Sequence, residues 1–497
     1  MALVGAVAVG AGCERASPSR PDVVFVSLDT TRADHLGAYG AAVATPAIDR
    51  VASEGVVFDN VSAACTTTLP SHVSMFTGLW PHRHGVPRNG FTVHERNEML
   101  PERLRDAGYE TVGVSAAVAL SKLLNFAQGF DAWDQDPETG LGHVVANREA
   151  RRAGAITDAA LSAVDRPRRG RAPRFFFVHY VDPHAPYDPP EPYRSRFAGP
   201  GADGSYEAVH RAQRRHRSHG GVPPSDPLRL SDRMLDRAPV EADEEDRSLA
   251  ALYAGEVAYM DRELGRFFDG LRERGLYDDA LIVVTADHGE TLWEHADAFS
   301  HGIGTYETTV AVPLVVRLPG RRHAGQRVAT PVSNVDIAPT VLAALGLALP
   351  KNVDGESLLP LLDGAAFGRD ASFSQGPLPA GELESGDLRW TNERKAHSVR
   401  VGDWKLVRTP YLDREELFSL ADDPGERVDR SDDGTPAVAA RLTELRARLD
   451  AWMAAADPLP SEFFPRTRPA NELEAAARRA MWERLEALGY VAGGDED

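Results

Sequence analysis

Cysteine, positive charge and long apolar runs are scarce in this chain of 497 residues. Its two cysteines, Cys13 and Cys65, are too few for a disulfide framework. No apolar run approaches the ~20 residues of a membrane-spanning helix, so we expect the body of the protein to be soluble. Lys and Arg number 55 against 74 Asp and Glu, a formal net charge of −19. This balance argues against a nucleic-acid partner.

The first residues of the chain favour a targeting segment. Residues 1–12 are apolar, rich in small residues and followed by Cys13. This segment resembles a bacterial lipoprotein signal, in which the cysteine is lipidated. The resemblance implies a periplasmic or surface-anchored lipoprotein in which residues 1–21 are signal and linker. The alternative is a buried or disordered apolar start with no targeting role.

The middle of the chain predicts an α/β fold. At 42% hydrophobic content, the chain can bury a large core. Strands 22–28 and 174–180 are nearly continuous apolar runs, as in parallel strands buried on both faces. Strands and helices alternate through residues 22–365, which predicts a doubly wound, mostly parallel sheet sandwiched by helices. Further strands are expected at 56–60, 110–115, 280–285 and 312–318, and helices at 46–54, 102–107, 144–164, 249–274 and 336–345.

Three segments stand apart from this alternation. Residues 188–246 are rich in Pro, Gly, Arg and His without clear periodicity, which predicts an irregular insertion that shapes the pocket. Residues 390–460 predict a small C-terminal α+β subdomain, with two short strands within 398–408 and a helix over 437–455. A charged helical tail is expected over 461–497.

Residues 65–78 predict a polar loop that enters a short helix. Pro70 suits the first helical turn and Gly78 suits the exit. Thr68 then lies just ahead of a helix N-terminus, where free N–H groups and the helix dipole favour a developing anion. A hydroxyl there can act as a nucleophile or hold an oxyanion. Alternatively, Thr68 or Ser71 merely caps the helix.

Three predicted strands end in acidic or histidine side chains. They are Asp29 after the first strand, Asp182 and His184 after the strand over 174–180, and Asp287 with His288 after the strand over 280–285. Ligands of open α/β sheets bind outside the carboxyl ends of the strands. Each residue alone suits a turn or a cap, but together with Thr68 they favour a divalent metal site.

Several motifs resemble the sulfatase family of the alkaline phosphatase superfamily, in that family's order from residue 22 onward. They are residues 23–29, 45–49, 69–78, 81–85, 285–290, 306–307, 312–320, 335–340, 404–405, 416–418 and 423–426. The resemblance implies an alkaline phosphatase-like fold and hydrolysis of phosphoric or sulfuric esters.

The nucleophile position departs from the sulfatase pattern. Sulfatases carry a cysteine or serine that matures to formylglycine, whereas this chain has Thr68 there, and His72 where an arginine is usual. Cys65 lies three residues too early to be converted. Thr30 and His288 replace a usual aspartate and a frequent asparagine. These changes are similar to the nucleotide pyrophosphatase and phosphodiesterase branch of the superfamily.

That resemblance implies two metal-binding sets. The first consists of Asp29, Thr68, Asp287 and His288, and the second of Asp182, His184 and His301. Imidazole-rich ligation suits one or two zinc ions, and calcium stays open as an alternative.

The same branch implies roles for other polar residues. Asn89 would hold a phosphate oxygen, unless it is simply a turn residue. His72 and His84 join it as catalytic candidates, and the possible proton donors are His84, His179 and His295.

We therefore expect a metal-dependent hydrolase of phosphate mono- or diesters that uses Thr68 as its nucleophile on a small anionic ester. Three alternatives stay open. They are a sulfuric ester hydrolase, a phosphoryl-group transferase and a catalytically dead binding protein. Retention of Asp29, Asp287, His288 and His301 argues against the last.

Overall fold

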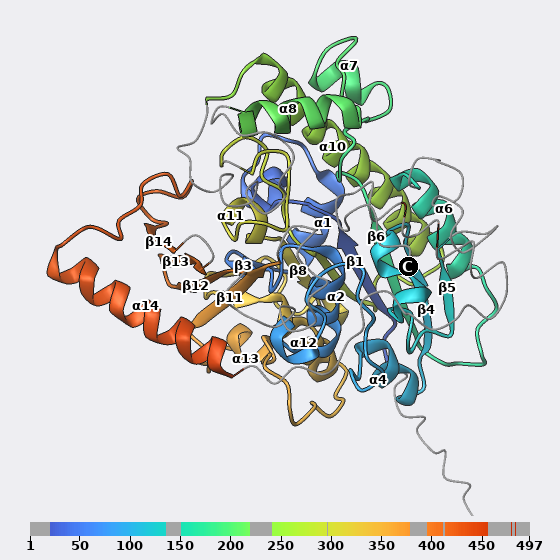
Figure 1. Ribbon diagram of the computed structural model, residues 1–497. Coiled ribbons are helices and arrows are strands. Elements are labelled where there is room, and N and C mark those ends of the chain that lie inside the picture. The colour runs from blue at the N-terminus through green and yellow to red at the C-terminus, as the bar shows by residue number, and fades with distance from the viewer. Residues whose placement is uncertain are drawn as a thin grey trace, which may run out of the picture.

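The computed structural model describes residues 20–135, 151–218, 241–295, 297–377, 395–410, 413–455, 479 and 483. Cys13 and nearly all of the tail expected over 461–497 lie outside these residues. Figure 1 shows a central sheet flanked by helices, with a smaller sheet and its long helix α14 at one side. Within the described residues, no helix has the length and apolar character needed to cross a membrane.

The central sheet has eight strands in the order β5-β4-β6-β1-β7-β8-β2-β9. Its strands are β1 (Val23–Leu28), β2 (Val56–Phe58), β4 (Glu110–Val114), β5 (Ala132–Asp134), β6 (Arg174–Tyr180), β7 (Leu281–Ala286), β8 (Leu314–Arg317) and β9 (Gln326–Val328). All neighbours pair in parallel except β8, which is antiparallel to both β7 and β2. The predicted doubly wound, mostly parallel sheet is confirmed.

Helices cover both faces of this sheet, and further helices pack outside them (Figure 1). They are α1 (Pro46–Glu54), α2 (Thr68–Thr77), α3 (Pro81–His84), α4 (Leu100–Asp106), α6 (Ala153–Val164), α7 (Tyr193–Phe197), α8 (Tyr206–Ser218), α10 (Glu244–Glu273), α11 (Glu307–Val310), α12 (Ile337–Ala344) and α13 (Leu359–Leu362). Short 3-10 turns occur at Ala33–His35, Gly37–Tyr39, Val118–Leu120, Lys122–Leu124, Pro319–Arg321 and Asn334–Asp336. A separate two-stranded pair joins β3 (Val61–Ser62) to β10 (Val332–Ser333).

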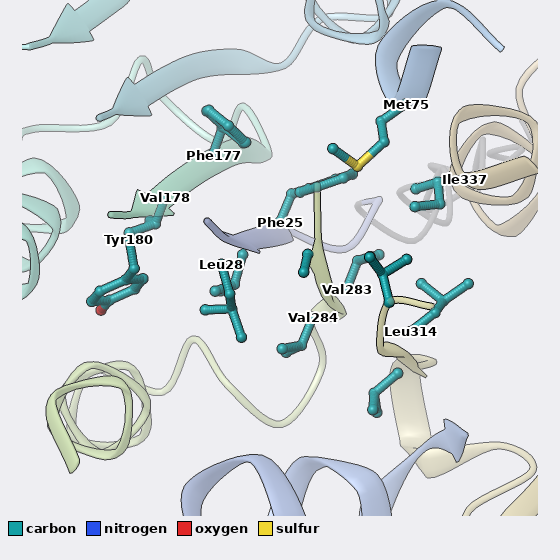
Figure 2. Close-up of a cluster of buried hydrophobic side chains, with 14 of the residues drawn as sticks. Phe25, Leu28, Met75, Phe177, Val178, Tyr180, Val283, Val284, Leu314 and Ile337 are labelled. Carbon is teal, nitrogen blue, oxygen red and sulfur yellow. The ribbon is translucent and has the colours of Figure 1, made fainter. Parts of the chain in front are cut away.

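Alternation along the strands assigns side chains to the two faces. Figure 2 shows Phe25 of β1 pointing towards Met75 of α2, whereas Leu28 extends away from them. On the Leu28 face, the Tyr180 hydroxyl lies 2.8 Å from Thr157 Oγ1 of α6. The odd-numbered positions of β1 therefore face α2, and the even-numbered positions face α6.

One carboxylate of α10 supports the start of α1. The two oxygens of Asp261 accept the N–H groups of Ala47 and Ile48 at 3.0 and 2.9 Å. These donors belong to the first turn of α1, which has no intrahelical acceptors for them. Burial raises the pKa of Asp261 to about 6, because desolvation disfavours the charged carboxylate, and the two N–H donors offset only part of that cost.

The C-terminal subdomain is a four-stranded antiparallel sheet covered by one helix. Its elements are β11 (Ala371–Gly376), β12 (Ala396–Val401), β13 (Trp404–Thr409), β14 (Arg414–Ser419) and α14 (Pro436–Ala454). Leu442, Leu445 and Leu449 recur at helical spacing on α14 and are buried against Leu406 and Leu417 of the sheet. The predicted strand pair around Trp404 and the predicted helix are confirmed.

The region predicted as an irregular insertion, 188–246, differs from the expectation. Helices α7 and α8 lie within it, so the prediction of irregular structure is wrong for their residues. In α8, Ala208, Val209 and Ala212 are buried although the helix also carries a glutamate and several arginines. So small an apolar stripe is easily missed in a sequence.

Candidate active site

The alternation of β1, β6 and β7 brings polar groups together on the face that α2 covers. Ser27 is in register with His179 of β6 and with Thr285 of β7. The next same-face position beyond Ser27 is Asp29, and beyond Thr285 it is Asp287. Parallel strands end at the same sheet edge, so both carboxylates arrive beside the N-terminus of α2.

Three buried ligand atoms converge at this edge. The Nε2 atom of His288 lies 3.9 Å from Asp29 Oδ1 and 3.4 Å from Asp287 Oδ2. None of these three atoms has a hydrogen-bond partner among the described residues. Buried polar atoms are rarely left without a partner. Two carboxylates and an imidazole are ligands that divalent metals prefer, so these residues fit a metal ion.

Backbone groups fix the orientation of this set. The Nδ1–H of His288 donates to the Gly289 carbonyl at 2.9 Å, which leaves the Nε2 lone pair free to ligate. Asp287 Oδ1 accepts the N–H groups of His288 at 2.9 Å and of Thr30 at 3.3 Å. The other oxygen of Asp287 therefore points to the shared space.

The electrostatics of the site also favour a cation. Burial, together with Asp287 and Glu290, raises the pKa of Asp29 well above its usual range. Burial raises the pKa of Asp287 to about 6 and lowers the pKa of His288 to about 3. Two buried carboxylates at close range repel each other unless a positive charge lies between them.

His72 is placed differently from a ligand. It forms, with His179 and Asp287, a second group whose potential ligand atoms lie within 4.8 Å of one another. However, its Nδ1–H donates to the Thr68 carbonyl at 2.8 Å, and its Nε2 accepts the Ser27 hydroxyl at 2.8 Å. Both nitrogens are occupied, so His72 positions the first turn of α2.

Thr68 is buried and is the first residue of α2, whereas the sequence predicts it just before the helix. Thr67 at the N-cap makes no side-chain cap bond. Instead, Asn89 Oδ1 accepts the Leu69 N–H at 2.7 Å, and its buried Nδ2 has no partner among the described residues. Ser71 Oγ–H donates to the Asp287 carbonyl at 2.6 Å, which ties α2 to the metal-binding residues.

The residues predicted for a second metal do not form a comparable group in the described part of the chain. His184 and His301 lie together, with ring centroids 5.1 Å apart, and the His301 centroid is 4.6 Å from that of His288. Asp182 Oδ2, however, accepts the Ala153 N–H at 2.7 Å at the start of α6.

The structure separates the three histidines considered as proton donors. His84 uses Nδ1 to accept the Val86 N–H at 3.1 Å and Nε2 to donate to the Pro70 carbonyl at 3.1 Å. His295 stacks on Tyr306 with centroids 4.0 Å apart. Only His179 among these three lies by the metal-binding residues, with Nε2 3.8 Å from Asp29 Oδ2.

Glu290 is a polar residue of the site that the sequence did not single out as functional. It is buried, accepts the Tyr187 hydroxyl at 2.8 Å, and lies 3.4 Å from His301 Nδ1. Its place directly after Asp287-His288-Gly289 is the signal that could have identified it.

Comparisons with known proteins identify the family of the chain. The family described as Sulfatase matches residues 21–347, and the family described as N-sulphoglucosamine sulphohydrolase, C-terminal, matches residues 303–453. The multifunctional alkaline phosphatase superfamily protein PehA of Trinickia caryophylli is 27% identical over 407 residues, covering 69% of this chain and 77% of PehA.

Two further relatives differ in their named chemistry. An N-acetylglucosamine-6-O-sulfatase of Bacteroides thetaiotaomicron is 26% identical over 482 residues, covering 83% of each chain. The crystal structure of a phosphonate monoester hydrolase of Agrobacterium radiobacter is similar with a TM-score of 0.66 and 25% identity, covering 86% of this chain and 96% of that one. The chain therefore belongs to the sulfatase family of the alkaline phosphatase superfamily, and it is a hydrolase acting on ester bonds.

Proposed function

We propose that the protein hydrolyses phosphate mono- or diesters, with Thr68 as nucleophile and one divalent metal held by Asp29, Asp287 and His288. The observation that carries the proposal is the convergence of three unpartnered, buried ligand atoms beside the N-terminus of α2. The single metal follows from the absence of a comparable group around Asp182 among the described residues. Zinc suits this mixed set, and calcium is the alternative.

When bound, the metal would lower the pKa of the Thr68 hydroxyl and neutralise negative charge on the substrate. Residues of the chain bind and orient the substrate. The Nδ2–H of Asn89 holds a non-bridging oxygen as negative charge builds on it. His72 keeps this turn in place through the Thr68 carbonyl.

The covalent steps balance as two displacements at phosphorus. Thr68 Oγ forms a bond to phosphorus while the bond from phosphorus to the ester oxygen breaks; that oxygen leaves with the electron pair and takes up, through solvent, the proton that Thr68 loses. Water then attacks phosphorus, the bond to Thr68 Oγ breaks, and a proton from the water returns to Thr68.

His179 is the residue we assign to stabilise the leaving oxygen, by a hydrogen bond from its neutral imidazole, because burial holds its pKa well below the usual range. Ser115 Oγ accepts the Ala117 N–H at 3.1 Å, so its hydroxyl hydrogen can donate to His179 Nδ1 at 3.3 Å. That hydrogen bond places the imidazole proton on Nε2, the nitrogen that faces the metal-binding residues.

A sulfate ester is the second candidate substrate, because one of the relatives is named a sulfatase. The threonine at position 68 makes the sulfate ester the less favoured substrate. Formylglycine expels sulfate through a geminal hydroxyl, and Thr68 has none. The names of the PehA protein and of the phosphonate monoester hydrolase also support reaction at phosphorus.

The test is a rapid-quench reaction of metal-analysed protein with phenyl phosphate, bis(phenyl) phosphate and phenyl sulfate, followed by peptide mass spectrometry. We expect cleavage of a phosphoester and a phosphoryl group on the peptide that contains Thr68. Thr68→Ser retains the labelling, and the isosteric Thr68→Val loses it. A label on another side chain, or cleavage of the sulfate ester alone, contradicts the proposal.

A further inference from the structure

A second cluster of buried polar groups lies where the C-terminal sheet meets the segment that leads into α2. Thr66 N–H donates to the Gln375 carbonyl at 3.1 Å, and Gln375 N–H donates to the Ala64 carbonyl at 3.0 Å. Gln375 of β11 is in turn paired with His397 of β12. Thr66 precedes Thr68 by two residues, so the cluster begins within roughly 7 Å of the nucleophile's backbone.

Several polar atoms of this cluster lack hydrogen-bond partners among the described residues. Both amide atoms of Gln375, both ring nitrogens of His397 and the Nδ1 atom of His82 are buried and unpartnered among the described residues. Nε1 of Trp452 is also buried and unpartnered among the described residues. Ring centroids of Trp452 lie 4.4 Å from that of His82 and 5.8 Å from that of His397. Buried polar groups are nearly always satisfied, so such a concentration indicates a polar ligand or ordered water.

The charge of the cluster indicates which ligand. Lys395, two residues before His397, is only 4% exposed. Its positive charge acts on both His82 and His397, and with burial it lowers the pKa of His82 to about 4. The histidines are therefore neutral, and the ammonium group repels a metal cation. Amide, imidazole and ammonium N–H groups together suit an anion.

We propose that Lys395, His397, His82 and Gln375 bind a second anionic group of the substrate, such as a carboxylate, carried by the part that leaves as the alcohol. This inference rests on the proposed function, since it takes the scissile ester to lie at Thr68. The hydrogen bond between Thr66 and Gln375 ties the cluster to the segment that carries Thr68. The favoured substrates are then esters whose alcohol is itself an acid.

The first test compares 3-carboxyphenyl phosphate with its neutral counterpart, 3-carbamoylphenyl phosphate. We expect wild type to favour the carboxylate by about 10- to 100-fold in kcat/KM, the discrimination that a charge-assisted hydrogen bond provides. Lys395→Met loses this preference, and Lys395→Arg keeps part of it. The exposed Lys351→Met variant serves as the matched control and retains the whole preference.

A second measurement needs no turnover. Isothermal titration calorimetry with 3-hydroxybenzoate and 3-hydroxybenzamide should show tighter binding of the acid to wild type and no such difference in Lys395→Met. If neither ester is hydrolysed but this difference persists, the anion site stands and the proposed function fails. The inference is overturned if wild type and Lys395→Met each show equal kcat/KM values for the two esters and bind the two alcohols equally. The cluster would then hold only ordered water.

Discussion

Replacing Asn89 should separate a structural role from a catalytic role of one side chain. Its Oδ1 accepts the Leu69 N–H at 2.7 Å and supplies the cap that Thr67 does not provide. Its Nδ2 is buried without a partner among the described residues, beside the proposed nucleophile. The two ends of the amide therefore serve different purposes, one in folding and the other in catalysis.

The magnitudes follow from these contacts. In Asn89→Ala the buried Leu69 N–H is left unsatisfied, which costs about 1–3 kcal/mol, in the same range as loss of a helix cap. We expect the free energy of unfolding to fall by about 2 kcal/mol in urea denaturation. Loss of a donor to the developing negative charge should lower kcat/KM by about 10²- to 10³-fold.

Asn89→Asp is the matched variant, because it keeps an oxygen acceptor for Leu69 N–H but has no amide donor. We expect its stability to lie between those of wild type and Asn89→Ala, and its kcat/KM on phenyl phosphate to fall at least as far as that of Asn89→Ala. Wild-type stability of Asn89→Ala refutes the cap, and wild-type kcat/KM of Asn89→Asp refutes the donor role.

Three further predictions concern stability. His72→Phe leaves the Ser27 hydroxyl and the Thr68 carbonyl without their partner, so unfolding in urea should show a loss of about 2–4 kcal/mol; wild-type stability contradicts the positioning role. Removing metal with a chelator should lower the midpoint of thermal unfolding, and adding metal back should restore it, since a ligand that binds only the folded state stabilises it; a midpoint insensitive to both contradicts the metal site. For Asp261 the folded pKa of about 6 lies above the usual 3.8. The folded protein thus binds more protons than the unfolded chain between these pH values, and this carboxyl's contribution to stability falls as the pH rises through them. At about 1.4 kcal/mol per pKa unit, wild type should lose roughly 2 to 2.5 kcal/mol relative to Asp261→Asn between pH 4 and pH 7. A difference between the two proteins that does not change with pH contradicts this prediction.

Much of the catalytic domain can be predicted from the sequence because its strands are buried on both faces. Continuous apolar runs mark β1, β6 and β7, and side chains that follow such strands must collect at one sheet edge. Asp29, Asp287 and His288 meet there for that reason.

Other side chains of the site depend on packing that sequence spacing does not specify. Asp182 follows β6 as expected, yet its carboxylate accepts an N–H at the start of α6. His84 and His179 look equivalent as proton donors in the sequence. Their difference comes from tertiary contacts, since His84 is occupied by Val86 and Pro70 whereas His179 lies beside Asp29.

Steady-state rates on matched esters decide whether Thr68 performs the displacement. Metal-loaded wild type, Thr68→Ser and Thr68→Ala should be compared on phenyl phosphate and phenyl sulfate. If Thr68 is the nucleophile, wild type cleaves the phosphoester, Thr68→Ser cleaves it measurably, and Thr68→Ala is slower by at least about 10³-fold. Hydrolysis by Thr68→Ala at the wild-type rate, of either ester, would contradict this role of Thr68.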